Sequence, residues 1–295
     1  MRSAPLLLLL AGALLLRPMC AAPAAKDSVR AFPDLIFAAP GGHKLQLDLL
    51  VPASTSKPPL VIYIHGGAWS QGDRKEQSFA WLAKSGFAVA SIEYRFAKDA
   101  IYPAQIQDCK AAVRWLRAHA GDYGYDATRI AAIGTSAGAH LAVLLGTTNG
   151  NKQLEGDVGG NSGQSSSVNA VVDFFGPVDF ILRAKTQPGM TDVPGSRVYN
   201  LLGGTPKDHE ALAKLASGAW QVTPDDAPLL IFHGAADKTV FPGQSEHLYE
   251  VAKAAGLDVS IHIVPNAGHD VKPFLTDGNK EIVVEFLTKY LKANP

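Results

Sequence analysis

Ser136 has the clearest capacity for chemistry in this chain, because it stands between two glycines in the sequence Gly-Thr-Ser-Ala-Gly at 134–138. A serine held in a tight turn between a strand and a helix exposes its hydroxyl and can act as a nucleophile. A hydroxyl is a poor nucleophile, so it needs a histidine to take its proton and a carboxylate to orient that histidine. The pattern is short, and it also fits an ordinary loop whose glycines relieve backbone strain.

The other two members of such a triad follow later strands. Asp237 comes shortly after the apolar run 228–232, in the turn His-Gly-Ala-Ala-Asp. His269 follows the run 259–264, in the loop Asn-Ala-Gly-His-Asp. The chain order Ser, Asp, His is that of one of the unrelated folds that carry this triad. We therefore predict Ser136 as the nucleophile, His269 as the base and Asp237 as the orienting acid.

Other acids and histidines compete for these roles. The rival aspartates, which lie at a strand end or in loops, are Asp173, Asp179, Asp225, Asp226 and Asp270. We prefer Asp237 because it alone shares a strand-end turn with the other motifs. The histidines to which we assign structural roles are His65 and His233 in loops, His262 in a strand, and His140 one helical turn after the serine.

A glycine pair after another strand supplies a candidate oxyanion hole. The run 60–64 is apolar and rich in β-branched residues, as expected of a strand buried on both faces, and His-Gly-Gly-Ala-Trp follows at 65–69. Glycines let the backbone approach a substrate closely, and N–H groups must already point at the oxygen that becomes negative during acyl transfer. We predict Gly67, Ala68 and Ala137 as the donors, although a plain turn fits the glycine pair equally well.

Six segments carry a family resemblance. They are HGGAWSQGDR at 65–74, SIEYR at 91–95, GTSAG at 134–138, FFGPVDF at 174–180, HGAADKTV at 233–240 and AGHD at 267–270. Together they resemble the α/β-hydrolase superfamily, and within it the esterase group with hormone-sensitive-lipase-like and secreted acetyl xylan or feruloyl esterase-like enzymes. The resemblance runs over about 36–290. It departs from the common pattern at Ala68, where many lipase relatives have glycine, and at Glu93, where aspartate is commoner.

The remaining apolar runs predict an α/β fold of one domain, residues 25–295. Strands are expected near 35–38, 44–50, 60–64, 88–93, 129–133, 170–174, 229–232 and 259–263, the first two antiparallel and the rest separated by segments long enough for crossovers. The resemblance implies an α/β-hydrolase fold with a mostly parallel eight-stranded sheet flanked by helices. Apolar positions three and four residues apart predict helices over 104–120 and 280–292 that pack on this sheet.

Two irregular segments interrupt the alternation. The stretch 149–169 is rich in Gly, Ser and Asn, so we expect a mobile surface loop. The stretch 183–221, with a helix near 210–217, lies between the sixth and seventh strands, where the resemblance implies a small cap insertion. Aromatic residues that could contact a substrate, or could simply pack, are Trp69, Phe175, Tyr199 and Phe241.

The N-terminal residues 1–24 read as a secretory signal peptide, with a basic residue, a leucine-rich run at 6–16 and an Ala-x-Ala site ending at Ala24. The run is too short to span a bilayer comfortably, so we expect a secreted or periplasmic protein without stable membrane insertion. Lipoprotein anchoring at Cys20 is a minor alternative. Cleavage would remove Cys20 and leave Cys109 as the only cysteine, which excludes an intramolecular disulfide.

The charge balance argues against a nucleic-acid partner. The whole chain has 27 basic and 27 acidic residues, and the predicted cleavage removes two arginines and no acid, leaving a formal charge of −2. No broad positive surface is therefore expected. The sequence has no His-Glu-x-x-His and no clustered metal-ligand spacing, so we predict no metal and no cofactor.

These features favour a secreted serine carboxylic-ester hydrolase that works through an acyl-enzyme. As the resemblance implies, its substrate would be an acetyl or feruloyl ester of plant polysaccharide or a similar small ester. The His-Gly-Gly-x-Trp loop also resembles arylformamidases, so an amidase of that kind is an alternative. A second alternative is a non-enzymatic binding protein with a hydrolase fold. A wide separation of Ser136 and His269 in the structure would favour this alternative.

Overall fold

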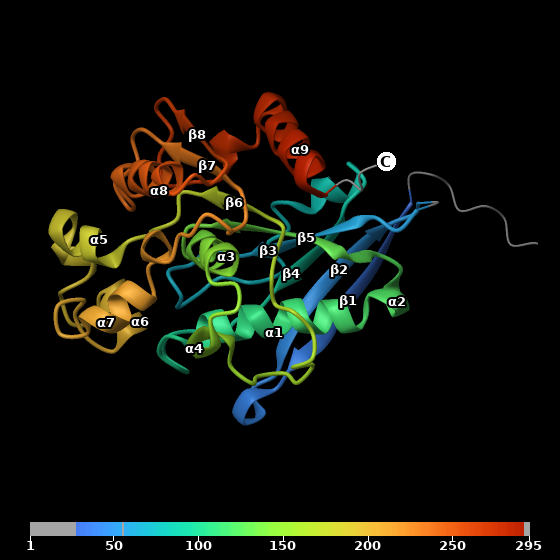
Figure 1. The fold of residues 1–295 in the computed structure, drawn as a ribbon, viewed down its shortest axis with the longest axis horizontal. Helices are drawn as coiled ribbons and strands as arrows, with labels where there is room; N and C mark the ends of the chain where they lie inside the picture. Colours follow the sequence, from blue (N-terminus) through green and yellow to red (C-terminus); the bar gives the residue numbers. More distant parts are fainter. Residues whose placement is uncertain (1–27, 55, 292–295) are drawn as a thin grey trace, which may run out of the picture.

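Eight strands form one twisted sheet in the computed structural model, which describes residues 28–54 and 56–291 (Figure 1). Their order is β1-β2-β4-β3-β5-β6-β7-β8. The strands are β1 (Val29–Ala38), β2 (Leu45–Pro52), β3 (Pro59–Ile64), β4 (Ala88–Ile92), β5 (Asp126–Thr135), β6 (Ala170–Phe174), β7 (Leu229–Gly234) and β8 (Val259–Val264). The predicted signal peptide and Cys20 lie outside the described residues.

The predicted fold is confirmed. β1 pairs with β2 and β2 with β4 in antiparallel fashion, and the other neighbours are parallel. The first strand is longer than its apolar residues suggest, because exposed residues from Val29 onward pair with β2 through backbone hydrogen bonds.

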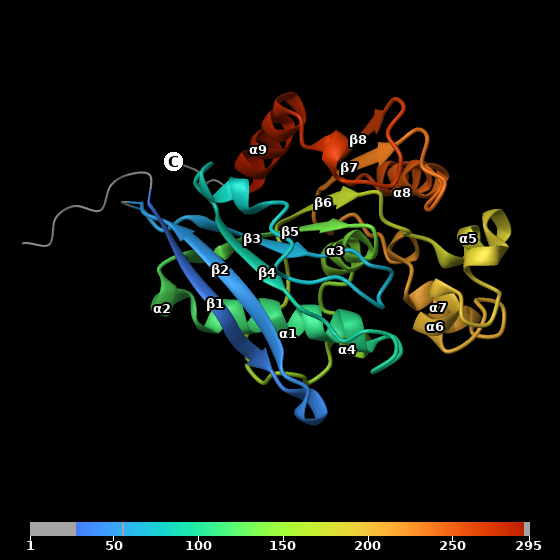
Figure 2. The same ribbon diagram turned by 180° about the vertical axis from the view of Figure 1, so that it is seen from behind.

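Alternating side chains along the strands build two cores, one on each face of the sheet. In β3, Leu60, Ile62 and Ile64 pack on one face, while Val61 and Tyr63 pack on the other. The first face is covered by α1 (Ala104–Ala118), α3 (Ala137–Thr147) and α8 (Gly243–Ala254). The second is covered by α9 (Asp277–Leu291) and the 3-10 helix Ala80–Ala83, and Figure 2 shows the sheet between these layers from behind. The inner strands β3, β6 and β7 are therefore buried on both sides, whereas the edge strand β8 is only partly buried.

The predicted helices are confirmed, with shifted ends. α1 ends at Ala118 and the short α2 (Ala120–Tyr123) follows it, while α9 begins three residues before its predicted start. The apolar stripe of α1 faces the core as predicted. Most of the rest of α1 is also buried, including Lys110 and Arg114.

These two buried cations contact the segment 149–169, which lies mostly at the surface as predicted. The segment is irregular and contains the short α4 (Lys152–Glu155), but it is fastened to α1. Lys110 and Arg114 both form ion pairs with Glu155, and Arg114 also donates to the carbonyl of Val158 at 2.9 Å. Charged anchors on the helix thus add to the few apolar contacts of the loop, which come from Leu154, Val158 and Val168.

The predicted cap lies between β6 and β7, at one end of the sheet (Figures 1 and 2). It contains α5 (Phe180–Thr186), α6 (Arg197–Leu202) and α7 (Glu210–Leu215), the last of which is the helix expected near 210–217. Five 3-10 turns complete the described chain: Pro40–Gly42, Ala80–Ala83, Pro188–Met190, Gly218–Trp220 and Lys272–Phe274.

Candidate active site

Ser136 lies in the turn from β5 to α3 with φ 52° and ψ −116°, a conformation that costs a non-glycine residue roughly 1–3 kcal/mol. The strain predicted for this turn lies at the serine, and the flanking glycines do not relieve it as they would in an ordinary loop. Neither Gly134 nor Gly138 has a positive φ. A Cβ at Gly134 would overlap the backbone of Gly138, and one at Gly138 would overlap the carbonyl of Ile64 in β3. The glycines therefore allow close packing of helix on strands, and the serine itself bears the strain.

Strained backbone gathers around this serine. Seven described residues other than glycine have a positive φ, and three of them are Asp or Asn, which tolerate that conformation. The other four are Ala68, Trp69, Ser136 and Phe175, and all of them line one cavity. Because unfavourable conformations of this kind persist where surrounding structure enforces them, their grouping makes this cavity the candidate functional site.

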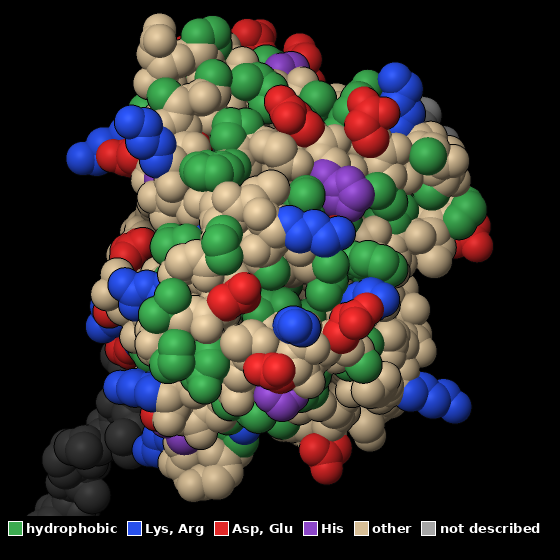
Figure 3. Space-filling view, turned by 90° about the vertical axis from the view of Figure 1, so that its left-hand side faces the viewer, with side chains coloured by type: hydrophobic (Ala, Val, Ile, Leu, Met, Phe, Trp, Pro, Cys, Tyr) green, Lys and Arg blue, Asp and Glu red, His purple; other side chains and the backbone are tan. Residues whose placement is uncertain are grey.

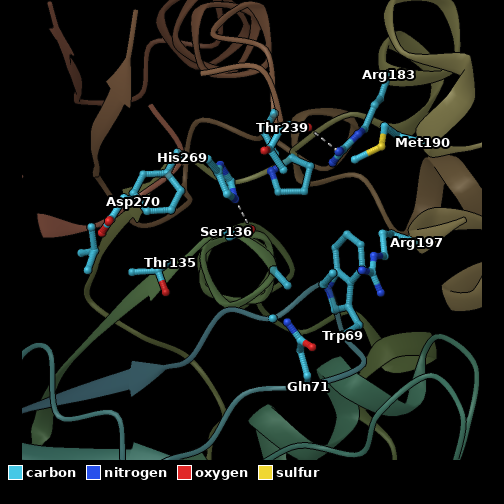
Figure 4. A pocket seen from close by; sticks show the side chains of 17 residues that line it. Trp69, Gln71, Thr135, Ser136, Arg183, Met190, Arg197, Thr239, His269 and Asp270 are labelled. Atoms are coloured by element: carbon cyan, nitrogen blue, oxygen red, sulfur yellow. Dashed lines mark hydrogen bonds between the residues drawn. The ribbon is translucent and has the colours of Figure 1, made fainter. Parts of the chain in front are cut away.

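A chain of hydrogen bonds joins the three predicted triad residues. The Ser136 hydroxyl lies 2.8 Å from Nε2 of His269, and His269 Nδ1 lies 2.7 Å from a carboxylate oxygen of Asp237 (Figure 4). A carboxylate only accepts, so the imidazole proton sits on Nδ1 and leaves Nε2 free to accept from the serine. This is the arrangement in which a histidine can take a hydroxyl proton.

Asp237 is held in its charged form. Burial alone would raise the pKa of its carboxyl, but hydrogen bonds from His233 and His269 and from the backbone hold that pKa well below its usual range. Its second oxygen accepts from the N–H groups of Thr239 and Val240 at 2.8 and 3.0 Å. These contacts fix the carboxylate in both position and charge.

The predicted rivals lie elsewhere. Asp173 is fully buried beneath the turn and accepts from the N–H of Gly176 at 2.8 Å, and burial raises its pKa to about 6. Asp179 caps α5 by accepting from two backbone N–H groups. Neither of these aspartates lines the cavity. Asp270 does line it, but it makes no hydrogen bond to His269.

The three predicted oxyanion donors lie around the same cavity as Ser136. The carbonyl of Gly67 accepts from the N–H groups of Ser70 and Gln71 at 3.0 and 3.1 Å, which folds the loop back on itself. A Cβ at Gly67 would overlap the carbonyl of Gln71, so this glycine is required by space as well as by its φ of 108°. The turn therefore holds Gly67 and Ala68 at the wall of the cavity that also contains Ser136.

Arg74 anchors the far end of this loop. Its guanidinium, 5% exposed, pairs with Asp34, Asp48 and Glu93, and the bond to Asp48 measures 3.2 Å. Glu93, the departure from the family pattern noted above, also accepts from the N–H of Gln46 at 2.8 Å. Its longer side chain thus joins the loop to β2.

His140 connects three parts of the site, a role that the sequence did not reveal. Its Nδ1 accepts from the indole N–H of Trp69 at 3.2 Å, and its Nε2–H donates to the carbonyl of Ala216 in the cap at 2.7 Å. Complete burial lowers the pKa of His140 to about 4, so the ring is neutral at pH 7. The oxyanion loop, α3 and the cap therefore meet at one uncharged imidazole.

The cavity measures about 470 Å³. Of the four aromatic candidates, Trp69 and Phe175 line it, while Tyr199 and Phe241 do not. Arg197 lines it instead of Tyr199, because residues two positions apart on α6 point in different directions. Phe241 lies just before α8 with 41% of its surface exposed. The cap residues that do line the cavity, and that sequence reasoning missed, are Arg183, Met190 and Arg197.

The described residues contain neither a membrane-spanning helix nor a cluster of metal-binding side chains. No helix in the described ranges is both long and apolar enough to cross a membrane. Within the same ranges, no three His, Cys, Asp or Glu side chains gather so as to hold a metal ion. Figure 3 shows the end of the molecule that carries the cap and α8, where basic and acidic side chains alternate.

The fold and the site together define an α/β-hydrolase of the esterase type. The chain belongs to the BD-FAE family, whose model matches residues 47–251.

Named relatives and solved structures agree with this assignment. Esterase LipC of Mycobacterium tuberculosis is 32% identical over 219 residues, 73% of this chain and 53% of LipC. A structure described as a truncated carbohydrate esterase from gut microbiota has a TM-score of 0.81 at 32% identity, covering 91% of this chain and 98% of that one. A bifunctional GH43-CE from Bacteroides eggerthii has a TM-score of 0.80 at 34% identity, covering 89% and 38%. The chain spans about half the length of the curated relatives it matches.

Proposed function

We propose that this protein is a serine carboxylic-ester hydrolase. The observation that carries the proposal is the continuous hydrogen-bonded chain from Ser136 through His269 to Asp237, with contacts of 2.8 and 2.7 Å. A non-enzymatic binding role would be favoured by a wide separation of Ser136 and His269. These two residues are instead in hydrogen-bond contact.

In the proposed reaction, Ser136 Oγ attacks the ester carbonyl while His269 Nε2 takes its proton. The carbonyl oxygen becomes an oxyanion, which the N–H groups of Gly67, Ala68 and Ala137 stabilise. His269 then gives its proton to the departing alcohol, leaving an acyl group on the serine. Water, deprotonated by His269, attacks this acyl-enzyme and releases the acid. Asp237 stabilises the imidazolium in both steps.

We further propose that the substrate is an acetyl or feruloyl ester on plant polysaccharide. One structure similar to this chain is described as a carbohydrate esterase and another as a bifunctional GH43-CE, and the cavity of about 470 Å³ is open at the carboxyl edge of the sheet. The leader-like sequence 1–24 supports action outside the cytoplasm, where such polymers occur.

Hydrolysis of p-nitrophenyl acetate by the purified chain tests the reaction. Ser136→Ala should lower kcat by at least about 10⁴-fold, because the nucleophile is lost. The matched control is Ser165→Ala, since Ser165 is exposed and bonds only to groups in its own loop and to Arg117. Full activity in the Ser136→Ala variant would refute the proposal. Release of acetate or ferulate from acetylated or feruloylated xylan then tests the substrate class.

A further inference from the structure

Three arginines in the described chain are buried, and one of them differs from the other two. Arg74 and Arg114 each pair with carboxylates. Arg183, on α5 in the cap, is only 3% exposed and forms no ion pair with any described carboxylate. The one hydrogen bond that its side chain makes to a described residue runs from Nη2 to the carbonyl of Thr239 at 2.9 Å, and its Nε is buried without a partner among these residues.

No carboxylate in the described part of the chain is bonded directly to the charged guanidinium of Arg183. Burial lowers the pKa of its guanidinium to about 10, so the side chain is still positive at pH 7. Asp237 is close enough to raise that pKa, but its oxygens are already occupied by His269 and by backbone N–H groups. An isolated buried cation is costly, and proteins ordinarily pair one with an anion.

Arg183 borders the cavity that contains Ser136. Figure 4 places Arg183 and Arg197 on one side of the serine and Asp270 on the other. Arg197 is exposed and donates to the hydroxyl of Ser70 at 3.3 Å, and it too has no ion pair among the described residues. One wall of the cavity is therefore positive, and its innermost charge is Arg183.

A purely structural role does not account for the charge. Arg183 links α5 to the loop after Asp237, but Gln187 already donates to the same carbonyl of Thr239 at 3.2 Å. A neutral donor would therefore suffice for this link. Arg117, by contrast, uses all three of its nitrogens to donate to backbone carbonyls. Arg183 keeps donors free beside the cavity.

We propose that Arg183 is an anion subsite of the active site, where it pairs with a carboxylate carried by the ester substrate. The proposal rests on the ester-hydrolase function proposed above, and it adds that the preferred ester carries a negative charge. A guanidinium presents parallel N–H donors that match a carboxylate, and such charge-assisted bonds are stronger than neutral ones. The carboxylate could belong to the acyl part, as in a dicarboxylic half-ester, or to the alcohol part, as in an acetylated uronic acid.

Two pairs of substrates test the proposal and separate these sources. On the acyl side, p-nitrophenyl hydrogen succinate is compared with its neutral methyl ester. On the alcohol side, an acetylated methyl glucuronoside is compared with the acetylated methyl glucoside. The quantity measured is the ratio of kcat/KM for the acidic ester to that for its neutral partner, because a general loss of activity cancels in this ratio.

The wild-type protein should prefer the acidic member of at least one pair. Arg183→Gln should lower that ratio by about 10- to 100-fold, the range expected for a charge-assisted hydrogen bond, and Arg183→Lys should retain part of it. Arg117→Gln is the matched control, since it removes a half-buried arginine outside the cavity and should leave the ratio unchanged. Thermal unfolding of each variant verifies that it folds.

Three outcomes are decisive. A wild-type ratio near one in both pairs, or a ratio unaffected by Arg183→Gln, would overturn the anion subsite. An equal loss on acidic and neutral esters would assign Arg183 a structural role and also overturn it. Absence of hydrolysis of every ester by the folded wild type would instead refute the proposed function itself.

Discussion

The carboxyl edge of the sheet and the cap line the same cavity, but they hold their side chains by different means. At the sheet edge, Ser136, Asp237 and His269 are fixed by tight turns, by closely packed backbone segments and by hydrogen bonds to both carboxylate oxygens of Asp237. In the cap, short helices present long side chains such as Arg183 and Met190, and Arg183 has unused donors. The sheet edge is thus preorganised for a reaction. The cap instead offers hydrogen-bond donors that a bound substrate could use.

The sharpest test of the sheet edge is Asp237→Asn, which keeps the shape of the side chain and removes its charge. Because the amide can no longer hold His269 in the required tautomer, kcat on p-nitrophenyl acetate should fall by about 10⁴-fold. Steady-state kinetics measure the loss, and Asp225→Asn in an exposed loop serves as the control. A loss below tenfold would mean that the edge is less preorganised than its contacts indicate.

Close packing at the edge is tested by Gly138→Ala. The added methyl would overlap the carbonyl of Ile64, so the free energy of unfolding should fall by about 3 kcal/mol or more, the upper range for overpacking. Urea titration measures the change. Gly121→Ala is the matched control, because its Cβ would meet nothing within 4 Å and its φ is not positive. That variant should be neutral or slightly stabilised, and equal losses in both would disprove the packing explanation.

His140, where the edge meets the cap, should make stability depend on pH. Its folded pKa of about 4 lies below the unfolded value of 6.5, so only the unfolded chain binds a proton between these pH values. Stability is therefore lost as the pH falls from 6.5 to 4, by about 3 kcal/mol from this residue. Urea titrations of the wild type and of His140→Asn at pH 7 and pH 4.5 measure it. The variant should show a shallower dependence, and identical slopes would refute the assignment.

The smallest effect is expected outside the cavity, at Phe241. Because this side chain is 41% exposed and does not line the cavity, Phe241→Ala should change kcat/KM by no more than about twofold. Kinetics on p-nitrophenyl acetate provide the measurement, with Phe175→Ala in the cavity wall for comparison. A large loss at Phe241 would mean that substrate extends beyond the described cavity.

The same contrast explains what the sequence could predict. Buried parallel strands appear as continuous apolar runs, and the residues that follow them must converge at one edge, so the triad could be proposed before any geometry was known. The sequence predicts the turn at Ser136 but not the close packing that requires glycine there, because overlap with Ile64 depends on how the strands are arranged.

The missed features depend on contacts between distant segments. Arg183 and Arg197 lie in an irregular stretch without a motif, and the direction of each side chain follows from the packing of short helices. The link through His140 requires a cap carbonyl 76 residues further along the chain. The anchoring of 149–169 depends on Lys110 and Arg114. In the sequence these charged residues of α1 are expected to be exposed, and it is the loop that buries them.

The bond between Ser136 and His269 joins residues 133 positions apart, and Asp237 lies 32 positions before His269. Contacts between such distant parts of a chain form only when the intervening strands have found their places. Hydrolysis can therefore report complete folding: a partly folded chain, even one with native helices, would lack the assembled base and nucleophile. Recovery of turnover after dilution from urea should follow the slowest step of refolding and not the earlier return of helical circular dichroism.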